Sequence, residues 1–217
     1  VLRLVLLNVL IVVPSFSLFI IYSAINKSGN NHLTFLLLIP MLLWLFPSIV
    51  ATTDVIRQYE NKETNTIFKD FFKSIKKLYL KSFIISIFVY LGIGLFWNSL
   101  SFFLNNATKG SLYIICFIIT ASFAMAFVLV LSQIPLVICY FKKMGILQIL
   151  KLSFIFAFKN IGINLIIAFC ILGFGFIDAI TTYAMALGGF SLPIYIMVKL
   201  SFKQYIRIYR MVEENEN

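Results

Sequence analysis

The 217-residue sequence is poor in charge, since only 12% of its residues are Asp, Glu, Lys or Arg, whereas 61% are hydrophobic. A soluble domain carries about 25% charged residues, because its surface must meet water. This chain cannot cover a water-facing surface of its own. Its charge-free apolar runs of about 20 residues suit the roughly 30 Å hydrocarbon core of a bilayer. We therefore expect an all-α, polytopic transmembrane helical bundle.

Residues that carry catalysis are also scarce. The single histidine, His32, falls in a short loop, which excludes a His-rich metal site and a Ser-His-Asp triad. No HExxH, GxSxG or GxxxxGK[ST] motif is present. The three cysteines lie in apolar runs without CxxC spacing, so we interpret them as small buried hydrophobes. The sequence predicts no enzyme, no metal site and no cofactor.

Apolar runs without charge predict six spans: 4–25, 33–53, 83–104, 112–140, 161–180 and 182–198. The last run is short and carries Gly188, Gly189 and Pro193, so five spans with a bent or re-entrant final helix is the alternative. The first run exceeds the 7–15 apolar residues of a signal peptide, and we interpret it as a retained helix. Residues 1–217 are expected to form a single integral membrane domain.

The distribution of basic residues predicts the orientation. With six spans and a cytoplasmic N-terminus, sixteen Lys and Arg residues fall inside and only Lys27 and Lys109 fall outside. Cytoplasmic loops carry this excess in membrane proteins, so both termini are expected in the cytoplasm. The two external links, 26–32 and 105–111, are seven residues each, too short for a receptor or catalytic domain.

The stretch 66–82 predicts an amphipathic elbow helix at the inner membrane surface. Its apolar residues are spaced by three and four, which is the pattern of one helix face. Thr66 is a candidate N-cap. The apolar face comprises Phe68, Phe71, Phe72, Ile75 and Tyr79, and the polar side comprises Lys69, Asp70, Lys73, Lys76 and Lys77. We expect the aromatic face toward lipid and the lysines toward water and anionic headgroups.

A second unit has the same order of elements. The proline-bearing run around Pro47 leads into the first elbow helix, and the run around Pro135 leads into a second elbow helix over 144–158. We interpret these as a weak internal repeat. The tail, 199–217, adds a basic stripe that includes Lys203, Arg207 and Arg210.

These basic helices admit two interpretations: electrostatic anchoring to anionic lipid of the inner leaflet, and docking of a cytoplasmic protein. Nucleic acid is not expected, because no aromatic–basic reading module is present and the aromatic residues face the membrane.

Two polar residues inside the spans are candidates for an intramembrane function. Asp178 ends the fifth predicted span, and an acid at membrane depth is a functional candidate by default. It also lies within a turn of Thr181 and Thr182, where it can reach the interface, and we favour an interfacial or structural role for it over an ion or proton role. Gln133, like Asn8 and Asn164, is expected to hydrogen-bond between helices. A stand-alone carrier or channel that uses Asp178 and the broken final helix is the alternative function.

Three segments resemble the YesL-like small membrane proteins, a bacterial family catalogued as a domain of unknown function. They are "LVLLNVLIVVPS", "FPSIVATTDVIRQYENKETNTIFKDFFKSIKKLYLKSF" and "QIPLVICYFKKMGILQILKLSFIFAFKN". The matching positions are Asn8, Pro14, Pro47, Ala51, Phe68, Asp70, Phe71 and Phe72. Phe46 stands where the family pattern has glycine, which leaves the subfamily open.

The resemblance implies an accessory role beside carbohydrate ABC importers in the plasma membrane of Gram-positive bacteria. The implied partners are the permease subunits and their ATPase, which several importers share in some cases. Residues expected to dock them are Lys69, Asp70, Lys73, Lys76, Lys77, Lys203, Arg207 and Arg210.

Overall fold

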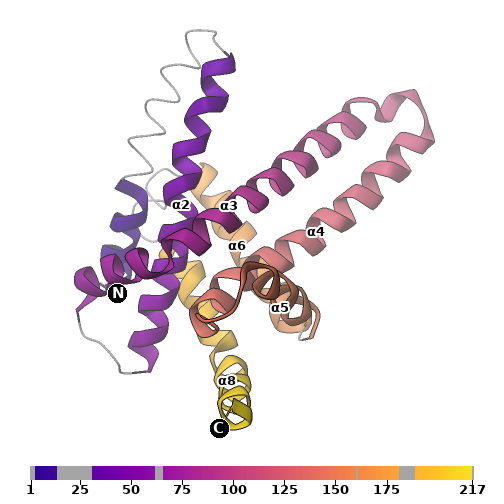
Figure 1. Ribbon diagram of the computed structural model, residues 1–217. Coiled ribbons are helices and arrows are strands. Elements are labelled where there is room, and N and C mark those ends of the chain that lie inside the picture. Colours follow the sequence, from indigo (N-terminus) through magenta and orange to yellow (C-terminus); the bar gives the residue numbers. More distant parts are fainter. Residues whose placement is uncertain (1–2, 14–30, 62–65, 160, 181–188, 217) are drawn as a thin grey trace.

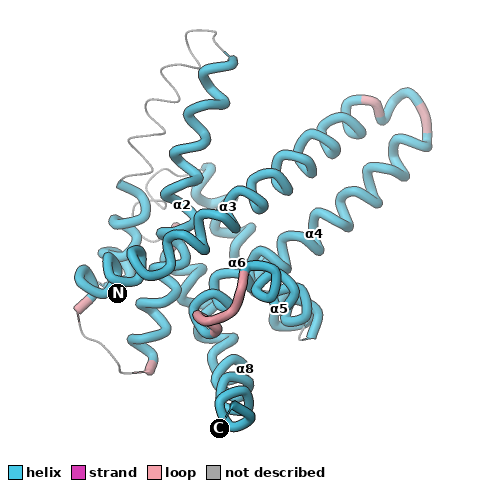
Figure 2. The backbone as a smooth tube through the Cα atoms, viewed as in Figure 1, coloured by secondary structure: helices cyan, strands magenta, loops and turns pink. Residues whose placement is uncertain are grey.

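The computed structural model describes residues 3–13, 31–61, 66–159, 161–180 and 189–216, and the regular elements within them are all helical (Figures 1 and 2). The elements are a helix Arg3–Val13, α2 (Asn31–Glu60), α3 (Ile67–Asn105), the short 3-10 helix η1 (Ala107–Lys109), α4 (Ser111–Tyr140), α5 (Ile146–Lys159), α6 (Ile161–Ile180) and α8 (Ser191–Glu216). The expected all-helical class is confirmed for the described part of the chain.

Among the described residues, two helices are long and apolar enough to cross a membrane. They are α3, with 39 residues, and α4, with 30; at 1.5 Å per residue they measure roughly 58 and 45 Å. A third crossing results if α5 and the first half of α6, which meet at a bend of 102°, are counted as one broken span. The chain is thus a membrane protein. Six spans remain a prediction, and much of the first and last predicted spans lies outside the described residues.

The first elbow helix is not a separate element. The expected boundary near residue 82 is absent, because α3 runs without a break from Ile67 to Asn105. Nothing in the sequence interrupts it there: no glycine or proline occurs between Ile67 and Leu91. Ser82 and Ser86 donate their hydroxyl groups to carbonyl oxygens of the preceding turn, so these buried polar side chains are satisfied within the helix. The elbow and the span that follows it therefore form one rod.

The second elbow helix is separate, as expected, but its bounds are those of α5. The chain leaves α4 at Tyr140, passes through a short turn and enters α5 at Ile146. The Gly145 amide donates to Gln148 Oε1 at 3.0 Å, so a side chain caps the start of α5. The two units of the weak repeat therefore differ: the first elbow continues into its span, and the second bends sharply before it.

The last helix, α8, joins two predicted segments. It begins at Ser191 and continues through the basic tail to Glu216. Pro193 lies in its first turn, where a missing backbone N–H breaks no intrahelical hydrogen bond. The final apolar run and the tail are thus one helix over the described residues.

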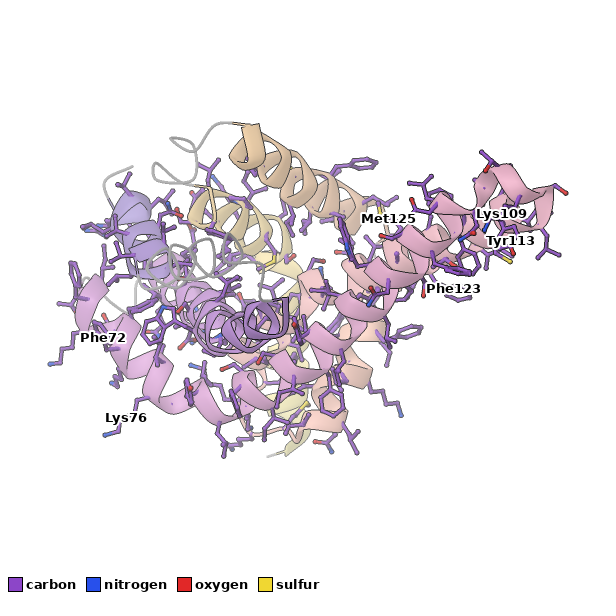
Figure 3. All side chains as sticks on the ribbon, turned by 90° about the horizontal axis from the view of Figure 1, so that it is seen from above. Phe72, Lys76, Lys109, Tyr113, Phe123 and Met125 are labelled. Atoms are coloured by element: carbon purple, nitrogen blue, oxygen red, sulfur yellow. The ribbon has the colours of Figure 1, made fainter. Side chains whose placement is uncertain are left out.

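The helices form a packed body and a projecting arm. The C-terminal part of α3 and the N-terminal part of α4 leave the body side by side as a hairpin (Figure 1). Figure 3 shows Lys109 and Tyr113 at the tip of this arm, on the opposite side of the molecule from Phe72 and Lys76. The body holds the core, where Val50, Phe71 and Ile138 are fully buried. The arm has few buried residues, as expected of helices that lie in lipid.

Candidate functional site

The lysine-bearing half of α3 has three faces instead of the two that its amphipathic pattern predicts. Phe71, Ser74 and Leu78 are buried and pack on the body, where α3 contacts α2. Phe68 and Phe72 lie on a second face and are 52% and 54% exposed. The predicted apolar stripe is therefore divided between a protein contact and an open aromatic face. A sequence pattern cannot separate these two, because both select apolar side chains.

The third face of this helix carries the candidate docking lysines. Lys69, Lys73, Lys76 and Lys77 are all exposed, and Figure 3 shows Lys76 and Phe72 pointing away from the body. Asp70 sits at the edge of this face and accepts a hydrogen bond from Thr66 Oγ1 at 2.8 Å. Thr66 occupies the N-cap position, but its side chain makes no capping hydrogen bond.

Beneath this surface, the carboxylate of Asp54 on α2 is 1% exposed and is contacted from three segments. Lys142, in the turn between α4 and α5, places Nζ 2.8 Å from Oδ1 and 2.9 Å from Oδ2. Ser74 of α3 donates to Oδ2 at 2.9 Å. From α2 itself, Arg57 NH2 lies 3.0 Å from Oδ1 and Gln58 Nε2 donates to Oδ2 at 2.8 Å. We call these five residues the Asp54 cluster.

The cluster contains two cations, Arg57 and Lys142, but only one carboxylate. The position of both cations near the C-terminal ends of helices explains why the extra positive charge is tolerated. Arg57 lies in the last turn of α2, and Lys142 follows the end of α4 by two residues. The C-terminal end of a helix carries about half a negative charge, which favours cations there. Lys81 of α3 adds to this arrangement by donating to the carbonyl oxygens of Lys142 and Met144 at 2.6 and 2.8 Å.

The chemistry of the Asp54 cluster is that of a clamp. Both carboxylate oxygens accept several charge-assisted or neutral hydrogen bonds, which satisfies a buried acid that would otherwise be costly. The contacts fasten the exposed lysine helix to α2 and to the turn after α4. The surface that carries Phe68, Phe72 and the lysines is therefore held in a fixed position on the body.

A second polar network lies between α4, α6 and α8. Gln133 Nε2 donates to Asn164 Oδ1 at 3.0 Å, and Asn164 Nδ2 donates to the carbonyl oxygens of Phe156 and Ala157 at the end of α5. Tyr205 of α8 donates its hydroxyl group to Gln133 Oε1 at 2.9 Å. The interhelical role expected for Gln133 and Asn164 is thus confirmed, and these bonds hold α6 folded against the end of α5.

Tyr205 follows the apolar part of α8, Ser191–Phe202, and is fully buried. Burial raises the pKa of its phenol well above the usual value, and the neighbouring Tyr140 raises it further. The Tyr205 hydroxyl therefore keeps its proton and acts as a donor to Gln133. The Tyr140 ring, 5.0 Å from that of Tyr205, also lies 5.4 Å from the Arg57 guanidinium, so aromatic contacts join this network to the Asp54 cluster.

Four of the predicted site residues fall outside the described side chains: Asp178, Lys203, Arg207 and Arg210. Their roles stay predictions. Among the described residues, no group of three or more His, Cys, Asp or Glu side chains is placed to hold a metal ion.

Sequence reasoning did not select the residues that the structure brings together most closely. Asp54, Lys142 and Tyr205 are not among the site residues predicted from the sequence. One signal was available for Asp54: it follows Ala51, Thr52 and Thr53 directly at the end of an apolar run. An acid in the helical continuation of such a run requires a partner cation, but the sequence does not say which of many lysines supplies it.

Comparison with known proteins bears on the first half of the chain. Residues 4–100 match the family described as "Protein of unknown function, DUF624". We call residues 4–100 the DUF624 region. The match confirms the resemblance to a YesL-like domain of unknown function over this range. No curated protein and no solved structure matches the chain.

The DUF624 region includes α2 and most of α3, and so it contains Asp54, Arg57 and Ser74. Lys142 lies beyond it. In the Asp54 cluster, the ion pair between Asp54 and Lys142 therefore joins the DUF624 region to the second half of the chain.

Proposed function

We propose that this protein is a non-catalytic accessory membrane subunit of a carbohydrate ABC importer, one that braces the permease subunits and helps to dock their ATPase. The carbohydrate class comes from the resemblance to the YesL-like family. The observation that carries the docking role is the exposed surface of α3, where Lys69, Lys73, Lys76 and Lys77 stand beside Phe68 and Phe72.

Two properties of this surface support a protein partner. Its aromatic side chains are more than half exposed, although Phe71, Ser74 and Leu78 on the neighbouring face of the same helix are buried. Aromatic residues within a basic surface are typical of interaction sites, because they bury much area at little entropic cost. The surface is also rigid, since Ser74 is hydrogen-bonded to Asp54 at 2.9 Å directly behind it. A fixed platform loses less conformational entropy when it binds a partner.

The test is purification of the tagged full-length chain from its native membranes in mild detergent, followed by mass spectrometry. Stoichiometric recovery of two permease subunits, with or without their ATPase, is the expected result. A photo-crosslinking amino acid at Phe72 is expected to capture the ATPase or a permease subunit. The matched control is the same substitution at Phe123, which is exposed on the arm. Recovery of the chain alone, with no crosslink from either position, would contradict the proposal and favour a stand-alone carrier.

A further inference from the structure

The helix α5 has three faces, as the lysine-bearing half of α3 does. Ile149, Ser153 and Phe156 are buried, and α5 packs mainly on α4. The side of α5 that points away from the body is exposed and carries both apolar and basic side chains. This exposed side has no part in the proposed docking surface on α3.

One exposed face of α5 is apolar. Leu147, Phe154 and Phe158 are 82%, 57% and 40% exposed, and we call them the apolar edge. They are seven and four residues apart, so they lie within about 40° of one another around the helix. The rings of Phe154 and Phe158 are in contact, with centroids 4.9 Å apart. Large apolar side chains gathered on one surface indicate a contact with lipid or with protein.

The other exposed face of α5 is basic. Lys151 and Lys159 lie further around the helix, beside Gln148, and Lys143 precedes α5 in the turn; we call the three lysines the basic edge. None of these three lysines forms an ion pair within the described part of the chain. No Asp or Glu occurs in residues 71–177. Three exposed cations without a counter-ion therefore accompany the apolar edge.

The orientation of α5 suits a membrane surface. With 14 residues it is about 21 Å long, too short to cross the roughly 30 Å hydrocarbon core. The sequence predicts a span over 161–180, and the bend of 102° between α5 and α6 then places α5 close to the plane of the bilayer. Figure 1 shows α5 at the lower end of the body, away from the tip of the arm. Because the tip is predicted to lie outside, α5 falls on the predicted cytoplasmic side.

We propose that α5 anchors the protein in the cytoplasmic leaflet, with the apolar edge among the acyl chains and the basic edge on the phosphate groups of anionic lipid headgroups. A helix of this pattern lies in the interface with its apolar side buried and its lysines toward the headgroups. Charge complementarity favours lipid as the occupant, since the cytoplasmic leaflet is negatively charged along the whole helix. The two elbow helices then have different roles, and the role of α5 does not rest on the proposed importer function.

The depth of α5 is measured with spin labels on single cysteines in the full-length chain, without Cys116, Cys139 and Cys170, in lipid nanodiscs. Leu147 and Gln148 are adjacent and both exposed, so Leu147→Cys and Gln148→Cys form a matched pair. The label at 147 is expected to collide mainly with oxygen, which dissolves in acyl chains, and the label at 148 mainly with a water-soluble nickel chelate. The ratio of oxygen to nickel collisions is expected to be at least about threefold higher at 147. Equal ratios would overturn the inference.

The lipid preference is measured by the association of spin-labelled phosphatidylglycerol and phosphatidylcholine with the full-length chain. Replacement of the basic edge by glutamine is expected to lower the preference for phosphatidylglycerol at least about threefold, whereas replacement by arginine keeps the charge and the preference. Because all three lysines are exposed and unpaired, these variants are expected to fold. An unchanged preference in the glutamine variant would contradict the role of the basic edge.

A photo-crosslinking amino acid at Phe154 separates lipid from protein as the occupant in native membranes. We expect it to become attached to lipid. Attachment to a protein instead would show that the apolar edge is a protein interface, and it would overturn the inference.

Discussion

Lys142 and Asp54 are 88 residues apart in the sequence, and the Lys142 ammonium nitrogen lies within 2.9 Å of both oxygens of the Asp54 carboxylate. The pair joins the DUF624 region to the second half of the chain. Asp54 is almost fully buried, whereas the Lys142 side chain is 23% exposed. Lys142 can therefore reach water if the pair is broken, but Asp54 cannot.

Asp54→Asn keeps the size of the side chain and removes its charge. Arg57 and Lys142 then face each other without a counter-ion, and loss of one partner of a buried ion pair costs about 3–5 kcal/mol. We expect a clear loss of stability in a detergent unfolding titration. The control is Asp70→Asn, on a partly exposed acid at the edge of the lysine face, with an expected change below about 1 kcal/mol. Equal stability of the two variants would show that the Asp54 cluster is not a clamp.

Tyr205→Phe removes only the hydroxyl group that donates to Gln133. Because Gln133 is 1% exposed, its oxygen then loses a hydrogen bond that water cannot replace, at a cost of about 1–3 kcal/mol. We expect a lower Tm and faster amide hydrogen exchange in α8. Tyr113→Phe, at the tip of the arm, is the control and should leave both unchanged. An unaltered Tm for Tyr205→Phe would mean that the bond contributes no net stability.

Gly92 and Gly94 form a matched pair on α3. A methyl group at Gly92 would overlap the end of the Phe127 ring of α4, whereas a methyl group at Gly94 meets no atom within 4 Å. Gly92→Ala is expected to displace that ring and to destabilise the arm by about 1–3 kcal/mol. Gly94→Ala is expected to stabilise the helix by about 0.5–1 kcal/mol. Thermal unfolding of the two variants in one lipid checks the order, and the reverse order would refute the close contact between α3 and α4.

Reversal of the charges at Lys69, Lys73, Lys76 and Lys77 to Glu tests the docking surface. If partners bind there, recovery of permease and ATPase falls at least about tenfold, which corresponds to a loss of about 1.4 kcal/mol. Sugar uptake is expected to fall with it. Replacement of the same four lysines by arginine keeps the charge and should preserve both. The docking role would be wrong if the glutamate variant, folded by circular dichroism, retained association and uptake.

The predicted orientation is testable by cysteine labelling from outside intact cells. In a variant without Cys116, Cys139 and Cys170, a new cysteine at Lys109 is expected to react with a membrane-impermeant maleimide. A cysteine at Lys76 is expected to react only after the membrane is opened. Lys76 and Lys109 lie on opposite sides of the molecule in Figure 3. The reverse result would invert the positive-inside assignment.

Much of the helical architecture follows from the sequence, because apolar runs without charge leave few alternatives in a bilayer. The predicted span 161–180 coincides with α6, and 112–140 differs from α4 by one residue. The boundary at residue 82 was wrong. A change from basic to apolar residues marks a change of surroundings, but a helix bends only where proline, glycine or an inserted group disturbs its hydrogen bonds.

The candidate site was less predictable. The sequence predicted that the lysines of α3 share an exposed helix face, because their spacing is that of one side of a helix. The sequence could not predict that Phe71 is buried while Phe68 and Phe72 are exposed. Positions that face lipid and positions that face protein both favour apolar residues. Ser48 and Thr52 look like any small polar residues in an apolar helix, and only their surroundings distinguish them from Thr53.

The sequence by itself determined that the chain is a helical membrane protein. The length of an apolar run and the charge of a loop are local properties, and they decide whether a segment suits the bilayer and how it is oriented. It also determined which face of α3 bears the lysines. Only the tertiary structure decided that Asp54 meets Lys142, that Tyr205 meets Gln133, and that the buried hydroxyl groups of Ser48 and Thr52 have no hydrogen-bond partner. Each of these depends on which helices pack together, and contacts between residues far apart in the chain leave no periodic signal in the sequence.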